Sequence, residues 1–278
     1  MSGAGLRIVC ALPAEAKPLI ARYRLQAHGL ASPFRVYRGP EGARWLVISG
    51  VGKIAAAAAV AHLAAVSAAA PHHLWLNLGL CGHSASDPGT LFRASKLIDM
   101  GSARRFYPQL LTPVSCAQGT LRTVEQPSAD YPEEGMYDME ASGFFASAIR
   151  YTSQELIQVF KVVSDSPKAP LRRFDKREVS AWIEGCLDGV EEALEGLLVL
   201  SSEESERLAD PEGYASFLER WHFSESQRLQ LRRLLARWAA LDGGLLDPDE
   251  AQQIVTSRAL LQWLTKRVET LPVGWGGP

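Results

Sequence analysis

Three carboxylates stand beside apolar runs that predict buried strands, and each is a side chain that can move a proton or bind a hydroxyl. Glu15 follows the run "LRIVCAL", Asp165 ends "LIQVFKVVSD", and Glu140 lies in the acidic stretch "EGMYDMEASG". A carboxylate can activate a water, a protonated carboxyl can protonate a leaving group, and an ionised one can accept two hydrogen bonds from a vicinal diol. Each also has a structural interpretation, because acids in a first helical turn complement the helix dipole and an aspartate before Ser-Pro can cap a turn.

Two glycine-containing loops also follow strand-like runs. They are "SGVGK" (49–53) and "NLGLCGHS" (77–84), and glycines there let the backbone approach a ligand closely. Neither has the spacing of a P-loop or a dinucleotide-binding motif. The histidines and cysteines lack metal-ligand spacing and no catalytic triad is convincing, so we expect neither a metal nor a covalent intermediate.

The elements that must position these residues alternate between strands and helices over about the first 165 residues. That order predicts an α/β fold, in which ligands bind outside the carboxyl ends of the strands. Residues 101–135 look irregular. Residues 175–200 predict a helix, and the chain beyond 201 has three or four amphipathic helices without a strand. We therefore predict two domains, 1–200 and 201–278.

Composition excludes several classes of protein. The chain has 278 residues, 47% hydrophobic and 22% charged, with a net charge of −2, which argues against a nucleic-acid footprint or a polybasic membrane anchor. The apolar stretch near the N-terminus is too short for a signal sequence or a membrane span. We expect a cytoplasmic protein with four reduced cysteines.

Taken together, the motifs resemble those of the nucleoside phosphorylase/nucleosidase superfamily, most closely the methylthioadenosine/S-adenosylhomocysteine nucleosidases. In chain order they are "IVCALPAEAKPLI", "VISGVGKIAAAAA", "LNLGLCG", "PGTLFRASKLID", "YDMEASGFF" and "FKVVSDSP", within residues 6–195. The resemblance implies a three-layer α/β/α sandwich with a mixed central sheet, to which the C-terminal helices are an all-α extension. It also implies a homo-oligomer, with a dimer as the default.

The resemblance assigns roles to particular residues. Glu15 would activate the attacking water, Met139 and Glu140 would hold the ribose, and Asp165 would protonate the purine at N7. Asp138 would be only a solvated or structural neighbour of Glu140. The other residues expected to bind substrate are Gly79, Leu80, Cys81, Gly82 and Ser164. The implied reaction is hydrolysis of a purine nucleoside to the free base, and it needs no cofactor.

Three departures from the family pattern leave alternatives open. Leu80 stands where the nucleosidases tend to have a hydroxyl residue. No arginine lies between residues 54 and 92, which favours hydrolysis over phosphorolysis. The stretch from Asp99 to Glu140 is short, so part of the purine pocket is missing or rebuilt. The alternatives are a phosphorylase of the same fold and a non-catalytic nucleoside-binding or scaffold protein. The helical extension could cover the pocket, form an oligomer interface or bind another protein.

Overall fold

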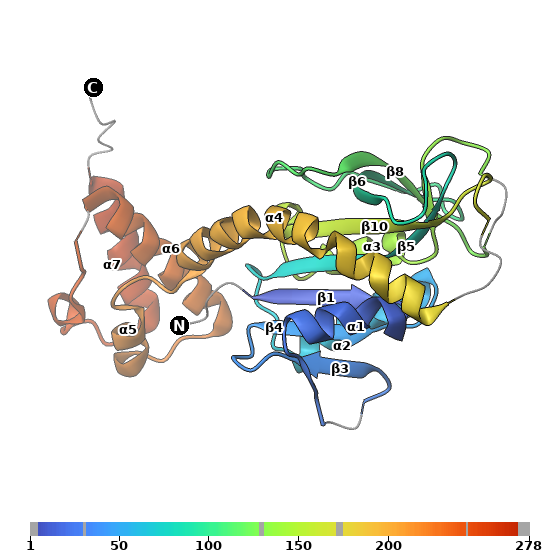
Figure 1. Ribbon diagram of the computed structural model, residues 1–278. Coiled ribbons are helices and arrows are strands. Elements are labelled where there is room, and N and C mark those ends of the chain that lie inside the picture. The colour runs from blue at the N-terminus through green and yellow to red at the C-terminus, as the bar shows by residue number, and fades with distance from the viewer. Residues whose placement is uncertain (1–4, 30–31, 128–130, 171–174, 243, 272–278) are drawn as a thin grey trace. The chain divides into compact units, whose positions relative to one another are not determined.

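The computed structural model describes residues 5–29, 32–127, 131–170, 175–242 and 244–271. Two compact units divide the chain, Met1–Arg207 and Leu208–Pro278. The first contains all the strands of the described residues, and the second is helical there (Figure 1). Each unit is described by itself below.

A mixed sheet forms the centre of the first unit. Its order is β10-β6-β8-β9-β5-β1-β4-β3-β2, with β7 beside β6 and a further pairing of β10 with β5. The strands are β1 (Leu6–Cys10), β2 (Gln26–Ala27), β3 (Arg35–Arg38), β4 (Arg44–Ile48), β5 (Leu74–His83), β6 (Leu91–Asp99), β7 (Arg105–Phe106), β8 (Ala117–Thr123), β9 (Met136–Asp138) and β10 (Ile157–Asp165).

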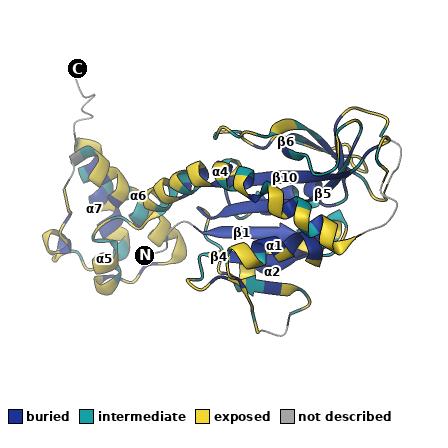
Figure 2. Ribbon diagram, in the orientation of Figure 1, coloured by how far each residue is buried: buried dark blue, intermediate teal, exposed yellow. Residues whose placement is uncertain are grey.

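Four neighbouring strands of this sheet are parallel, in the order β4, β1, β5 and β10. They read as nearly continuous apolar runs because both of their faces are covered, and Figure 2 shows them buried along most of their length. Their carboxyl ends meet at one edge of the sheet. That edge is where a parallel sheet places its ligands.

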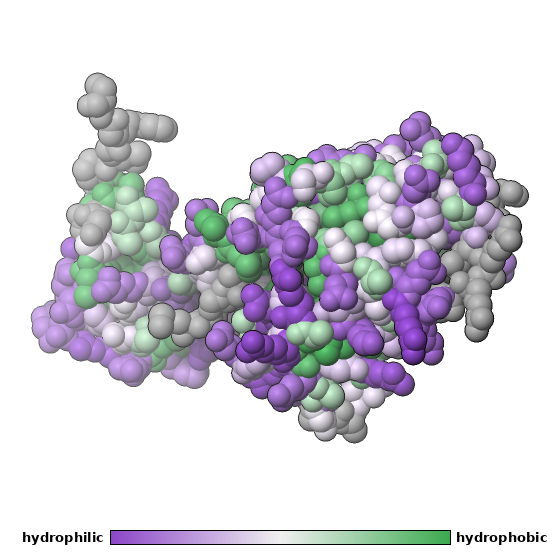
Figure 3. Space-filling view, viewed as in Figure 1, coloured by the Kyte–Doolittle hydropathy of each residue, from purple (hydrophilic) through white to green (hydrophobic). Residues whose placement is uncertain are grey.

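Helices cover both faces of the sheet. On one face, α2 (Lys53–Val66) and α3 (Ala141–Ala148) pack with one hydrophobic cluster, and on the other α1 (Pro13–Arg22) and α4 (Lys176–Leu208) pack with a second. Figure 3 shows the face that carries α1 and α4, where hydrophilic side chains border smaller hydrophobic patches. The predicted three-layer α/β/α arrangement with a mixed sheet is therefore confirmed. α4 continues through residue 200, where the sequence predicts a domain boundary.

Strands β7 and β8 correct the expectation that residues 101–135 are irregular, and β9 lies within the acidic stretch that follows. β8 pairs in parallel with β6 over seven residues, and β9 pairs with both β8 and β5. β8 has the sequence "AQGTLRT", in which Leu121 is the only large apolar residue. Its pairing partners, rather than its own hydrophobicity, make it a strand.

The second unit is a small helical cluster. It contains α5 (Tyr214–Arg220), α6 (Glu225–Asp242) and α7 (Ser257–Thr270), and a short 3₁₀ helix at Pro248–Ala251. A second 3₁₀ helix, Gln154–Leu156, belongs to the first unit. Trp221 and Trp238 are buried in its core and Trp263 packs against it. Over the described residues of both units, none of the helices combines the length and the apolar character that a membrane crossing requires.

Candidate functional site

A cavity of about 820 Å³ opens at the carboxyl ends of the parallel strands. Eight of the nine residues that the sequence singles out line it, namely Glu15, Leu80, Cys81, Gly82, Met139, Glu140, Ser164 and Asp165. They come from segments far apart in the chain and meet because β1, β5 and β10 end at the same edge. The volume lies within the range of small-molecule sites.

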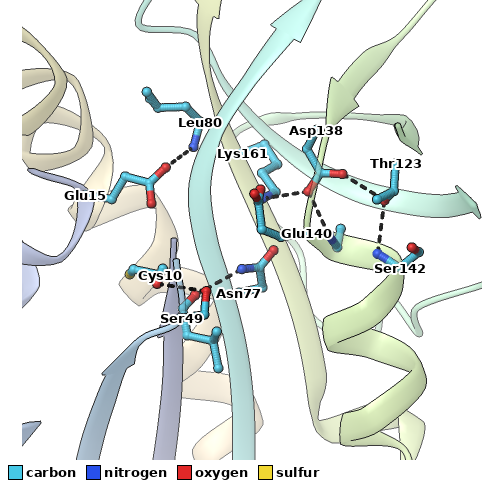
Figure 4. Close-up of polar contacts among 12 residues, drawn as sticks. Cys10, Glu15, Ser49, Asn77, Leu80, Thr123, Asp138, Glu140, Ser142 and Lys161 are labelled. Carbon is cyan, nitrogen blue, oxygen red and sulfur yellow. Dashed lines mark hydrogen bonds and ion pairs between the residues drawn. The ribbon is translucent and has the colours of Figure 1, made fainter. Parts of the chain in front are cut away.

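Glu15 sits in the first turn of α1 and is 2% exposed. Its Oε2 accepts a hydrogen bond from the backbone N–H of Leu12 (2.8 Å), and its Oε1 accepts one from that of Leu80 (2.9 Å) (Figure 4). Burial raises the pKa of Glu15 to about 6, although the cation of Lys161 and the two N–H groups oppose the rise. The carboxylate is thus held in one orientation while its pKa lies near neutrality.

Gly79 is the one predicted residue that does not line the cavity. A Cβ at this position would lie 2.9 Å from Oε1 of Glu15, closer than real Cβ contacts allow. The glycine therefore makes room for the Glu15 carboxylate against β5.

Glu140 lies immediately before α3 and is 7% exposed. Its Oε1 accepts a hydrogen bond from the N–H of Gly52 (2.9 Å), in the loop that follows β4. Gly52 has φ +106°, a conformation that favours glycine, so this loop residue is needed to aim its N–H at the acid. Burial also raises the pKa of Glu140. Met139 stands beside it on the cavity wall.

Asp165 ends β10 and is half-buried. The hydroxyl oxygen of Ser164 lies 2.5 Å from Oδ1 of Asp165 and 3.1 Å from the carbonyl oxygen of Cys81, so it can donate to one of them at a time. The hydroxyl of Tyr131 donates to Oδ2 of Asp165. A hydroxyl group therefore lies within hydrogen-bond distance of each carboxylate oxygen of Asp165.

A buried ion pair underlies the site, and the sequence analysis did not single it out. Nζ of Lys161 lies 2.9 Å from Oδ2 of Asp138, and the two side chains are 1% and 0% exposed (Figure 4). Burial alone would lower the pKa of Lys161, but the carboxylates of Asp138, Glu140 and Glu15 raise it above its ordinary value. A buried ammonium thus offsets the charge of the carboxylates around the cavity.

Asp138 is consequently not the solvated residue that we considered. Its Oδ1 accepts from Thr123 Oγ1 (2.8 Å), and its Oδ2 accepts from the N–H of Ala141 (2.8 Å) as well as pairing with Lys161. The one sequence signal for this pair was a lysine inside the apolar run "VFKVVS". A lysine buried in such a run needs a counter-charge.

The chemistry available on the described walls is that of carboxylates, hydroxyls and backbone N–H groups. Nothing among the described residues groups three or more histidine, cysteine or acidic side chains as a metal site would. The described lining residues also include no lysine, arginine or histidine that could bind a phosphate group. The site can therefore supply a base, an acid and an acceptor for hydroxyl groups.

Comparison with known proteins finds the same fold. Neither a scan against family models nor a search of curated proteins gives a match. Among solved structures, the Arabidopsis thaliana 5′-methylthioadenosine nucleosidase is similar over 70% of this chain and 96% of its own, with a TM-score of 0.57 and 17% identity.

Two bacterial structures are similar to a comparable degree. The Helicobacter pylori 5′-methylthioadenosine/S-adenosylhomocysteine nucleosidase with butyl-thio-DADMe-Immucillin-A covers 70% of this chain and 99% of its own, with a TM-score of 0.55 and 11% identity. The Colwellia psychrerythraea enzyme in complex with adenine covers 70% and 95%, with a TM-score of 0.52 and 16% identity. The first unit thus has the fold of these nucleosidases, as the sequence resemblance predicts.

Proposed function

We propose that the protein hydrolyses the N-glycosidic bond of a purine nucleoside and releases the free base. The observation that carries the proposal is the meeting of Glu15, Glu140 and Asp165 on one cavity, each with a different set of partners. The fold shared with methylthioadenosine and S-adenosylhomocysteine nucleosidases supports it. The described residues that line the cavity all belong to the first unit.

In the proposed reaction, Glu140 accepts hydrogen bonds from the ribose hydroxyls and Met139 packs beside the sugar. Asp165 donates a proton to N7 of the purine as the bond between C1′ and the base breaks. Glu15 takes a proton from a water whose oxygen bonds to C1′. The sugar gains positive charge in the transition state and the base gains negative charge, and these carboxyl groups complement both. The products are the neutral base and the free sugar.

Hydrolysis is favoured over phosphorolysis because the described walls lack a cation for phosphate. Lys161 lies nearby but is 1% exposed and paired with Asp138. Glu15 is also already placed as a base for water, which phosphorolysis does not need.

Base release tests the proposal. Purified full-length protein is incubated with adenosine, inosine and their 5′-deoxy and 5′-thio analogues, with and without phosphate, and the free base is measured by chromatography. Release that is independent of phosphate supports a nucleosidase. Release only with phosphate would move the function to a phosphorylase, and nucleoside binding without release would indicate a binding protein.

The pH profile tests the role of Glu15. Because burial places its pKa at about 6, the ionised base is lost as pH falls through that value. We expect kcat/KM to be level above about pH 7, to reach half of that level near pH 6, and to fall about tenfold per pH unit well below it. A profile that stays flat from pH 7 to pH 5 would contradict this role. Glu15→Gln should be inactive throughout and is the control.

We also propose that the protein forms a dimer through the outer face of α2. The exposed positions of this helix are Ile54, Ala58, Ala61 and Ala65, all apolar, and Ile54 is 80% exposed. A helix that is apolar on all sides is normally buried. Covering this face with a second copy of the same chain would bury it.

Light scattering coupled to gel filtration measures this association. We expect a dimer for the wild-type chain and a monomer for Ile54→Glu. Leu229→Glu, on an exposed position of α6, is the matched control and should remain a dimer. A monomeric wild-type chain, or a dimeric Ile54→Glu variant, would refute this interface.

A further inference from the structure

Tyr131 enters the cavity at the position of the proposed general acid. It lies in the chain between β8 and β9, is half-buried and lines the cavity. Its hydroxyl donates to Oδ2 of Asp165. The acid that should face the base therefore faces a side chain of the protein.

The ring of Tyr131 also packs directly against Gly82, which lines the cavity. A Cβ added at Gly82 would come within 2.6 Å of Cε1 of Tyr131, so only a glycine lets the ring lie there. The ring lies 5.1 Å, centroid to centroid, from that of Tyr137, which also lines the cavity. A planar aromatic ring thus occupies the place between Gly82 and Asp165, where a purine would have to lie to be protonated.

The residues that follow Tyr131 are fixed to the sheet by several hydrogen bonds. Tyr137 Oη accepts from the N–H of Glu133 and donates to its carbonyl oxygen, both at 3.0 Å. Arg122 donates to the carbonyl oxygen of Glu134 (2.8 Å), and the N–H of Gly135 donates to Ser84 Oγ (3.0 Å). These contacts begin two residues after Tyr131 and bring its side chain up to Asp165.

We propose that Tyr131 is a specificity-determining residue that occupies the base subsite of the empty protein, and that a base binds only by displacing it. The proposal rests on the proposed function, because it takes Asp165 as the group that meets the base. An entering base must replace both the contact with Gly82 and the hydrogen bond to Asp165. Rings that are planar and can hydrogen-bond to a carboxyl group, as purines do, satisfy both requirements.

If Tyr131 and a base compete for the same place, the apparent dissociation constant of the base should depend on Tyr131. When the binding-competent state is populated only in part, the apparent dissociation constant rises in inverse proportion to that population. Removal of the ring in Tyr131→Ala should therefore tighten adenine binding by about tenfold, if Tyr131 is in place about nine-tenths of the time. Tyr131→Phe loses only the hydrogen bond and should fall between the two.

Isothermal titration calorimetry with adenine measures this on the full-length wild type, both variants and Tyr107→Phe, an exposed tyrosine outside the cavity lining. Tighter binding by Tyr131→Ala, with Tyr107→Phe unchanged, is the expected result. Unchanged or weaker binding by Tyr131→Ala would overturn the proposal, since Tyr131 would then be neutral or would stack on the base.

A measurement on the wild-type chain guards against a variant that folds poorly. Burial and the contact with Asp165 raise the pKa of Tyr131, and this slows attack by reagents that react with the phenolate. Nitration of Tyr131 by tetranitromethane, followed by mass spectrometry with Tyr107 as internal reference, should become faster when adenine is bound. An unchanged or slower rate would overturn the proposal.

These readouts do not depend on turnover. Wild-type protein that releases no base from any nucleoside would refute the proposed function, whatever Tyr131 does. Wild-type protein that does release base, together with unchanged adenine binding in Tyr131→Ala, would refute only the role of Tyr131.

Discussion

Asp165→Asn should lower the rate of base release by about 10²–10⁴-fold, the usual contribution of a general acid. Asparagine keeps the shape of the side chain, and its one amide oxygen can still accept a hydrogen bond from Ser164 or from Tyr131, but it cannot give a proton to N7. The base would then have to leave as an anion. The rate under saturating nucleoside, measured by chromatography of the free base, checks the prediction.

The matched control is Asp188→Asn, because Asp188 lies on α4 with its side chain 88% exposed. It should retain wild-type activity. Adenine binding to Asp165→Asn would show that its cavity is still formed. An Asp165→Asn variant that keeps more than a tenth of the wild-type rate would remove Asp165 from the mechanism.

Lys161→Met should lower the free energy of unfolding by about 3–5 kcal/mol, because it leaves the buried carboxylate of Asp138 without its counter-charge. Both side chains of this ion pair are at most 1% exposed, so water cannot replace the lost partner. Urea denaturation of the full-length protein measures the loss. The double variant Lys161→Met/Asp138→Asn removes both charges and should recover much of the lost stability.

Lys53→Met provides the comparison for Lys161→Met. Lys53 pairs with Asp99 and Glu125, but it is 21% exposed and Glu125 is 63% exposed. Ion pairs in contact with water contribute about 0–1 kcal/mol, so the loss should be correspondingly small. A Lys161→Met variant no less stable than Lys53→Met would show that the buried ion pair of Lys161 and Asp138 does not stabilise the fold beneath the site.

Much of the site could be predicted from the sequence because its residues stand at the ends of apolar runs. Glu15, Gly82 and Asp165 each follow or end a strand of the parallel set, and parallel strands bring such positions to one edge. The short spacing between a strand and its polar residue is a local property. The sequence therefore predicts the grouping without knowledge of the complete sheet order.

The parts that were not predicted depend on contacts between distant segments. Lys161 and Asp138 are 23 residues apart in the chain, and nothing local shows that the lysine of an apolar strand meets that aspartate. β8 has too few apolar residues to be identified as a strand until β6 and β9 lie on either side of it. Tyr131 lies outside every recognised motif, and only the path of the chain brings its hydroxyl to Asp165.

The central claim is that a water, activated by Glu15, adds to the sugar as the base leaves. Turnover of the best nucleoside substrate in water enriched in oxygen-18, without phosphate, tests it most directly. The sugar product is reduced at once by borohydride so that label cannot enter it later by exchange with the water. The account predicts one labelled oxygen in the reduced sugar and no label in the base. Base release that yields an unlabelled sugar, or a sugar phosphate once phosphate is added, would contradict it.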